Sequence, residues 1–165
     1  MNAIELLKNN HELVLTLIHE LADNIKQIEQ TEQDTVVCER MNSFAEFRDT
    51  LTEHTWLEEH MFYSELVGFP ETRRLVDESY GEHKRIRDVL ATMENLRKEG
   101  HCDRWDDKLK ELQQDLLHHV AREEEQLFPK ARQVLGEGRL ENLYLKMKDL
   151  QTTKSRWPGQ SAFGN

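Results

Sequence analysis

The sequence predicts an all-α protein: an up-down-up-down antiparallel four-helix bundle with a short fifth C-terminal helix and a flexible tail. Two observations lead to this fold class. Apolar residues recur every three or four positions through four long segments, as the buried face of a bundle helix requires. Clusters of glycine, proline and polar residues separate these segments, and short connections between long helices favour antiparallel neighbours.

The first two helices are expected over residues 2–30 and 34–66. A polar cluster at residues 30–34 separates them, and Gly68 and Pro70 end the second. Each helix has one face that fits a bundle interior. The residues predicted to face inward are Leu7, His11, Val14, Ile18, Leu21 and Ile25 in the first helix and Val37, Met41, Phe44, Phe47, Leu51, His54, Glu58 and Met61 in the second.

The third and fourth helices are expected over residues 71–99 and 103–134. Glycine and polar residues at 100–103 separate them, and the Gly-Glu-Gly sequence at 136–138 ends the fourth. The residues predicted to face inward are Val76, Tyr80, His83, Ile86, Leu90 and Met93 in the third helix and Trp105, Leu109, Leu112, Leu116, His119, Glu123 and Leu127 in the fourth.

A shorter fifth helix is expected over residues 139–150. It carries Leu140, Leu143, Met147 and Leu150 on one face, and we expect this face to lie against the bundle.

Length and charge limit the classes of function. The 165 residues suffice for one domain with an ordinary core, expected over residues 1–150, followed by a flexible tail at 151–165. The net charge of −10 opposes binding to nucleic acid, which requires clustered Lys and Arg. No stretch approaches the roughly 20 apolar residues of a membrane span, and the N-terminus lacks the apolar run of a signal peptide. The sequence therefore predicts a cytoplasmic protein that binds neither nucleic acid nor membrane.

Two cysteines are present, Cys38 and Cys102, and they form no CxxC motif. Neither a disulfide framework nor a thiolate zinc site is indicated, which fits a reducing compartment. The predicted bundle places both cysteines toward the same end. A redox-sensitive disulfide therefore stays open as an alternative to two ordinary thiols.

The most informative feature is a His-x-x-x-Glu motif that occurs twice, at residues 54–58 and 119–123. Residues four apart project from the same face of a helix, so each copy directs an imidazole and a carboxylate to a common point. With a rise of about 1.5 Å per residue, the two motifs and the inward histidines of the other two helices fall within a slab of roughly 10 Å. The spacing predicts a dinuclear metal site, with iron as the leading candidate. The candidate ligands are His11, His54, Glu58, His83, His119 and Glu123.

Each candidate ligand also has a purely structural explanation. A single histidine on an apolar stripe is more often a core residue with a hydrogen-bond partner than a metal ligand. An inward glutamate is harder to explain without a cation, because an unpaired buried carboxylate is costly. Two such glutamates, each one turn after an inward histidine and at matching depth, favour the metal site.

Other residues near the motifs have alternative roles. Glu59 and Glu124 follow the two motif glutamates and either face solvent or hydrogen-bond a ligating imidazole. Tyr80 lies one turn before His83 on the same stripe, either as a core aromatic residue or as a ligand or hydrogen-bond donor at the metal. Solvated or supporting roles are expected for the histidines outside the stripes. These are His19, His60, His101 and His118.

The combined pattern comprises His11, His54-x-x-x-Glu58-Glu59, His83 and His119-x-x-x-Glu123-Glu124 with the following Leu127-Phe128-Pro129. It resembles the hemerythrin-like, or HHE, cation-binding domains over most of the chain. The resemblance implies a four-helix bundle whose interior holds two iron ions in an oxo- or hydroxo-bridged centre. It also implies that Glu58 and Glu123 bridge the metals and that the histidines cap them.

The sequence departs from the oxygen-carrying hemerythrins at two points. Those proteins have a second histidine four residues after the third-helix ligand, where this chain has Arg87, and a fourth-helix His followed five residues later by Asp. The resemblance therefore does not extend to reversible oxygen transport. The implied donors fill roughly ten of the twelve positions of two octahedral irons, which leaves about two for water, Tyr80 or a small ligand. Ferritin-like di-iron proteins share the architecture but use Glu-x-x-His motifs, which this sequence lacks.

Four functions follow from these alternatives. The first is a non-haem di-iron protein that binds or senses O₂, NO or peroxide, or responds to iron and oxidative stress. The second is an enzyme that reduces peroxide or NO, or oxidises a small substrate, at the same centre. The third is iron storage or donation to iron–sulfur repair, which is less favoured because similar repair proteins carry an additional Cys-containing N-terminal segment. The fourth is a structural bundle whose inward polar residues satisfy one another without metal.

The metal and the partners stay open at this stage. Zinc or another divalent metal would compete for a site of histidines and carboxylates. The expected partner is a small diatomic or peroxide ligand. Trp56 and Trp157 lie outside the inward stripes and are candidates for a homodimer contact, because aromatic residues are enriched at interfaces.

Overall fold

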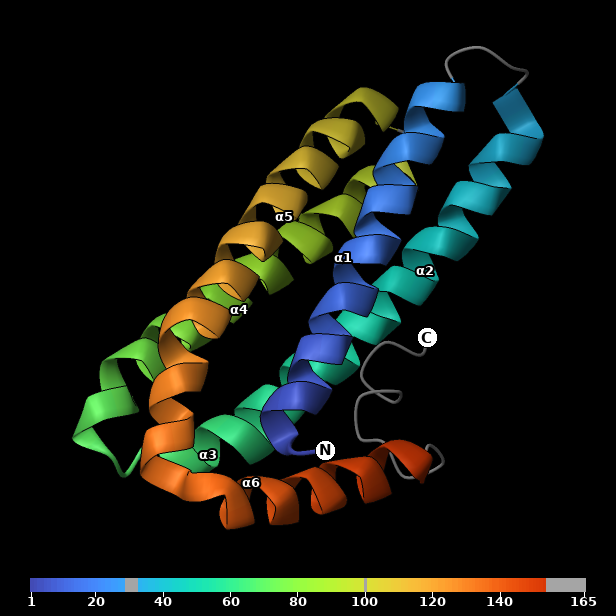
Figure 1. Ribbon diagram of the computed structural model, residues 1–165. Helices are drawn as coiled ribbons and strands as arrows, with labels where there is room; N and C mark the ends of the chain where they lie inside the picture. Colours follow the sequence, from blue (N-terminus) through green and yellow to red (C-terminus); the bar gives the residue numbers. More distant parts are fainter. Residues whose placement is uncertain (29–32, 100, 154–165) are drawn as a thin grey trace.

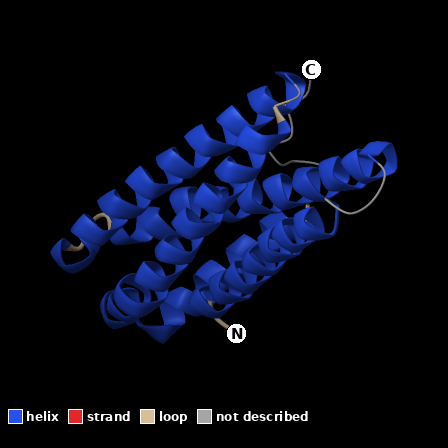
Figure 2. Cartoon of the chain, turned by 90° about the horizontal axis from the view of Figure 1, so that it is seen from above, coloured by secondary structure: helices blue, strands red, loops and turns tan. Residues whose placement is uncertain are grey.

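The fold was examined in a computed structural model that describes residues 1–28, 33–99 and 101–153, with side chains at 24–42 and 102–103 left undescribed. The described chain is helical and contains no strand (Figure 2). The long helices lie side by side as a bundle (Figure 1), which confirms the predicted all-α class. The elements are α1 (Ala3–Ile28), α2 (Gln33–Leu57), η1 (Glu58–Phe62), α3 (Tyr63–Leu66), α4 (Pro70–Glu99), α5 (Cys102–Arg122), η2 (Glu123–Leu127) and α6 (Phe128–Thr152).

Two π-helical turns interrupt the long helices, and each begins at the glutamate of a His-x-x-x-Glu motif. A π turn holds one more residue than an α turn, so the inward stripe shifts by one position after it. After Glu58 this shift buries Phe62 of η1 and Tyr63 of α3 and leaves Met61 only half-buried. Met61, which was predicted to face inward, packs against the core cluster but stays partly exposed, because the prediction assumed a constant helical period.

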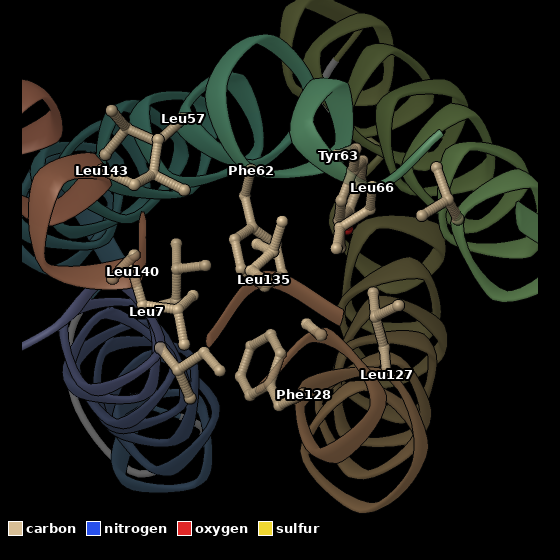
Figure 3. Packing of buried hydrophobic residues seen from close by; sticks show 14 of the residues in the cluster. Leu7, Leu57, Phe62, Tyr63, Leu66, Leu127, Phe128, Leu135, Leu140 and Leu143 are labelled. Carbon is tan, nitrogen blue, oxygen red and sulfur yellow. The ribbon is translucent and has the colours of Figure 1, made fainter. Parts of the chain in front are cut away.

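The buried apolar residues form two clusters that lie on opposite sides of the candidate ligands. On α1, His11 falls between Leu7 of one cluster and Val14 of the other, and the same alternation holds on the other long helices. Figure 3 shows the cluster at the α6 end, where the Phe62 and Phe128 rings meet edge to face with centroids 5.5 Å apart. The clusters exclude water from both sides of the polar residues between them.

The chain turns sharply at Gly136 within α6. Its φ of 73° and ψ of 164° lie in a region that is accessible essentially to glycine. After the turn, α6 runs across the end of the bundle beside the N-terminus (Figure 1), where Leu140, Leu143 and Met147 are buried in the cluster of Figure 3. This part of the chain closes one end of the bundle.

No helix of the described chain is long and apolar enough to cross a membrane. Several sequence expectations concern side chains outside the described residues. They are the inward positions of Ile25, Val37 and Met41, the relative placement of Cys38 and Cys102, and the interface role of Trp157.

Candidate metal centre

All six candidate ligands lie together in the bundle interior, and none is more than 3% exposed. The elements α1, α2, α4 and α5 each supply one histidine, and the two π turns supply the glutamates. The ligand atoms of His11, His54, Glu58 and His119 lie within 4.8 Å of one another. The helical spacing of the sequence therefore brings its candidate residues to one point.

The Glu58 carboxylate lies between two pairs of imidazoles. Its Oε1 atom is 3.4 Å from the Nε2 atom of His11 and 3.2 Å from that of His54. Its Oε2 atom is 3.1 Å from the Nε2 atom of His83 and 3.7 Å from that of His119. Each oxygen of the Glu58 carboxylate thus faces one pair of histidines.

The second carboxylate, from Glu123, faces one histidine of each pair. Its Oε2 atom is 3.3 Å from the Nε2 atom of His11 and 3.6 Å from that of His119. The Nε2 atoms of His83 and His119 are themselves 3.2 Å apart. The imidazole nitrogens and carboxylate oxygens of the candidate ligands therefore lie close together in a small volume.

Several of these converging atoms have no hydrogen-bond partner among the described residues. They include the Nε2 atoms of His11 and His54 and one oxygen each of Glu58 and Glu123. Buried polar atoms without a partner are costly, so native proteins keep few of them. A cation among these atoms would satisfy all of them at once, and imidazole with carboxylate is a donor set that suits iron, zinc and related metals. The residues fit a metal centre.

When no cation is bound, protons on the histidines balance the negative charge of the two buried carboxylates. Burial alone would lower the pKa of His11, but the carboxylates of Glu123 and Glu58, whose oxygens lie 3.3 and 3.4 Å from its Nε2 atom, raise it to about 10. The same carboxylates overcome burial at His119 and also raise its pKa to about 10. Burial and the neighbouring histidines lower the pKa of His54 to about 3, against the attraction of Glu58. Metal ligation by imidazole requires the neutral ring, so a bound cation would displace the protons of His11 and His119.

The glutamate that follows each motif supports a histidine of another helix. The Nδ1 atom of His83 donates to Glu59 over 2.9 Å, and that of His11 donates to Glu124 over 2.9 Å. Arg87, which occupies the place of the additional histidine in oxygen carriers, donates to Glu59 over 2.7 Å. Such bonds orient an imidazole so that its other nitrogen faces the metal. The supporting role left open for Glu59 and Glu124 is therefore present in the structure.

Tyr63 is the residue of this centre that sequence reasoning missed. Its buried hydroxyl group donates to Glu123 Oε1 over 2.5 Å and lies 3.4 Å from both Glu58 Oε2 and His83 Nε2. Burial and these two carboxylates raise its pKa far above the usual range. Tyr80, the tyrosine singled out from the sequence, is half-buried and donates instead to the backbone carbonyl of Glu59 over 3.1 Å.

Tyr63 could have been found by aligning the two His-x-x-x-Glu motifs with each other. Phe62-Tyr63 follows Glu58 at the same distance in sequence as Leu127-Phe128 follows Glu123. The sequence pattern included Leu127-Phe128 but not Phe62-Tyr63. In the structure the Tyr63 ring lies beside His83 as the Phe128 ring lies beside His11.

The four histidines outside the stripes are exposed in the structure. His60 stacks on Trp56 with centroids 4.4 Å apart, and His19 pairs with Asp23 over 3.1 Å. None of them belongs to the cluster of the six candidate ligands.

The comparisons with known proteins agree with this geometry. The family described as the hemerythrin HHE cation binding domain matches residues 2–131, a range that contains all six candidate ligands and Tyr63. No curated protein and no solved structure matches the chain significantly. Because the family match covers most of the chain and includes its metal-type residues, this protein belongs to the hemerythrin HHE cation-binding family.

Proposed function

We propose that this protein binds two iron ions and uses them to bind or sense O₂, NO or peroxide, or to respond to iron and oxidative stress. The observation that carries the proposal is the Glu58 carboxylate, whose two oxygens face two separate imidazole pairs. One metal would be held by His11 and His54 and the other by His83 and His119, with Glu58 and Glu123 between them.

Iron, when bound, supplies the affinity for a diatomic or peroxide ligand and the electrons for any reaction with it. The residues of the chain supply the geometry and a dry surrounding. The hydroxyl group of Tyr63 adds a hydrogen-bond donor at the His83 side. Phe128, whose ring stacks on His11 with centroids 5.6 Å apart, gives the opposite side an apolar wall.

The proposal includes the finer topology predicted from the sequence. We infer that the four long helices alternate in direction and that the part of α6 after Gly136 acts as a separate fifth helix. The turn at Gly136 and the burial of Leu140, Leu143 and Met147 support this division.

An enzyme is the second candidate, and Tyr63 favours it. A buried phenol hydroxyl beside the two carboxylates is a hydrogen-bond donor that would orient a peroxide or NO ligand for reduction. The sensing function predicts stoichiometric binding of the small molecule, whereas the enzyme predicts its repeated consumption when an added chemical reductant supplies the electrons for each turnover. Measuring the amount of peroxide or NO consumed per chain separates the two.

The test of the metal centre is anaerobic loading with Fe(II), followed by elemental analysis and by the visible spectrum after exposure to air. We expect about two irons per chain and ligand-to-metal charge-transfer absorption. His119→Ala should reduce the content to at most one iron, whereas His19→Ala, which removes an exposed histidine paired with Asp23, should change nothing. Failure of the wild-type protein to take up iron would overturn the di-iron proposal.

A further inference from the structure

The candidate centre consists of two halves with nearly the same geometry. The α1 and α2 histidines, His11 and His54, have ring centroids 4.8 Å apart, and the α4 and α5 histidines, His83 and His119, have centroids 4.7 Å apart. His11 lies 5.6 Å from the Phe128 ring and His83 lies 5.6 Å from the Tyr63 ring. Both distances repeat between equivalent residues, although the ring planes meet at different angles, 78° and 61° within the histidine pairs and 5° and 30° against Phe128 and Tyr63. The halves can therefore be compared position by position.

The halves differ in chemistry at three equivalent positions. The first position precedes His83 in one half and His11 in the other, and the second precedes the glutamate of each motif. The third is the aromatic residue that lies against His83 in one half and against His11 in the other. The pairs are Glu82 and Asn10, Arg122 and Leu57, and Tyr63 and Phe128.

The first two differences decide how the motif histidine of each half is supported. Glu82 Oε2 accepts a hydrogen bond from His119 Nδ1 over 2.8 Å and another from Arg122 over 3.0 Å. His54 is equally buried, yet neither of its ring nitrogens has a hydrogen-bond partner among the described residues. The bond to Glu82 therefore holds the His119 ring with its Nε2 atom inward, and no described hydrogen bond does the same for His54.

Supporting bonds of this kind have a known effect on metal affinity. A carboxylate on the remote nitrogen fixes the ring and raises the basicity of the ligating nitrogen, and its loss typically weakens metal binding about 10- to 100-fold. The His83 and His119 pair has two such bonds, from Glu59 and Glu82. The other pair has one, from Glu124 to His11.

The third difference adds an oxygen to the better-supported half. The Tyr63 hydroxyl donates its proton to Glu123 Oε1 over 2.5 Å, and its oxygen lies 3.4 Å from His83 Nε2, so an oxygen atom with free lone pairs faces this half. In the other half, the Phe128 ring occupies the equivalent place and offers no donor. All three differences therefore favour the same metal position.

We propose that the two metal positions are unequal: a divalent metal enters the position of His83 and His119 first and is retained there, while the position of His11 and His54 is weaker and exchangeable. This inference rests on the proposed dinuclear centre and deepens it. A weak second position would be filled or emptied as the supply of metal changes, which suits a protein that responds to metal or oxidant.

The test is an anaerobic titration of the metal-free protein with Fe(II), read by calorimetry and by competition with a chelator of known affinity. We expect two binding steps whose affinities differ at least about tenfold. His54→Ala should remove the weaker step and leave the tighter one, and Glu82→Asn, which copies the other half, should weaken the tighter step about tenfold or more. Circular dichroism of the metal-free variants tests whether each remains folded.

A gain-of-function variant tests the cause. Asn10→Glu should give His54 the support that Glu82 gives His119 and should strengthen the weaker step. Asn9→Glu adds the same charge one residue away at an exposed position and serves as the control. Two steps of equal affinity in the wild-type protein, or equal effects of the two glutamate variants, would overturn the inference while leaving the dinuclear centre intact. Failure to bind any Fe(II) would overturn the proposed function itself.

Discussion

At the scale of single residues, the hydrogen bond from the Tyr63 hydroxyl group to Glu123 can be removed while every candidate ligand is kept. Tyr63→Phe keeps the ring beside His83 and Tyr80 but leaves Glu123 Oε1 with only a long contact of 3.4 Å to Ser79 among the described residues. We expect the metal-free protein to lose about 1–3 kcal/mol of unfolding free energy, because a buried carboxylate loses its donor.

The measurement is urea unfolding of the metal-free protein, with Tyr80→Phe as the matched control. Tyr80 is half-buried, and its hydroxyl donates to a backbone carbonyl, so its loss should cost only about 0.5–1.5 kcal/mol. A smaller effect for Tyr63→Phe than for Tyr80→Phe would show that the short contact to Glu123 contributes little.

Sequence reasoning succeeded for the residues that follow a regular helical period and failed where the period changes. His54 and Glu58 lie one α turn apart, so their common face could be predicted from spacing alone, and the same holds for His119 and Glu123. Tyr63 follows a π turn, and counting in steps of three or four from Glu58 leads to Met61 instead.

At the scale of the elements, Gly136 sets the direction of the second part of α6. A Cβ atom built at Gly136 meets nothing within 4 Å, so any penalty for Gly136→Ala comes from the backbone conformation alone. We expect Gly136→Ala to destabilise the protein by about 1–3 kcal/mol, because φ of 73° with ψ of 164° strains any residue with a side chain.

Gly138 is the matched control, because it lies two residues further on, is helical and also has open space around a built Cβ atom. Gly138→Ala should stabilise the protein by about 0.5–1 kcal/mol through its higher helix propensity. Unfolding in urea measures both changes. If Gly136→Ala were as stable as Gly138→Ala, the turn at Gly136 would not be a feature of the protein in solution.

The elements themselves were largely predictable because glycine, proline and polar residues mark their ends. The expected third helix at 71–99 agrees with α4 within one residue. The Gly-Glu-Gly sequence at 136–138 predicted a break, and the structure confines it to Gly136. The π turns were not predictable from composition, because their residues have ordinary helical propensity.

At the scale of the whole molecule, the bundle is a pseudo-symmetric frame whose two halves carry unequal side chains. The repeat of the His-x-x-x-Glu motif was visible in the sequence. The inequality was not, because it depends on which residue lies against each imidazole. Asn10 and Glu82 differ in sequence like many other pairs of residues, and only the position of the His54 and His119 rings gives that difference a meaning.

The stability of the whole metal-free protein should depend on pH through the protons held in the centre. The pKa values of His11 and His119 are raised to about 10 in the folded chain, and that of His83 is also raised, since the surrounding carboxylates outweigh burial. A raised histidine pKa contributes stability that is fully present below the unfolded value of 6.5 and is lost as pH rises toward the folded value.

We therefore expect the unfolding free energy of the metal-free protein to fall between pH 6.5 and 10, by up to about 1.4 kcal/mol per pH unit for each proton that only the folded chain retains. It should also fall in acid, because His54 and Glu58 have lowered pKa values and stabilise the fold in their unprotonated forms. Urea unfolding measured from about pH 3 to pH 10 covers both the acid and the alkaline changes.

Binding of a cation should remove the loss of stability at alkaline pH. A bound metal replaces the protons of His11 and His119, and its affinity increases as fewer protons compete for the imidazoles. The difference in unfolding free energy between the Fe(II)-loaded and metal-free proteins, both kept anaerobic, should therefore widen from pH 6.5 to 9. A difference that stays constant over this range would mean that the metal does not displace protons from these histidines, and would place it elsewhere in the molecule.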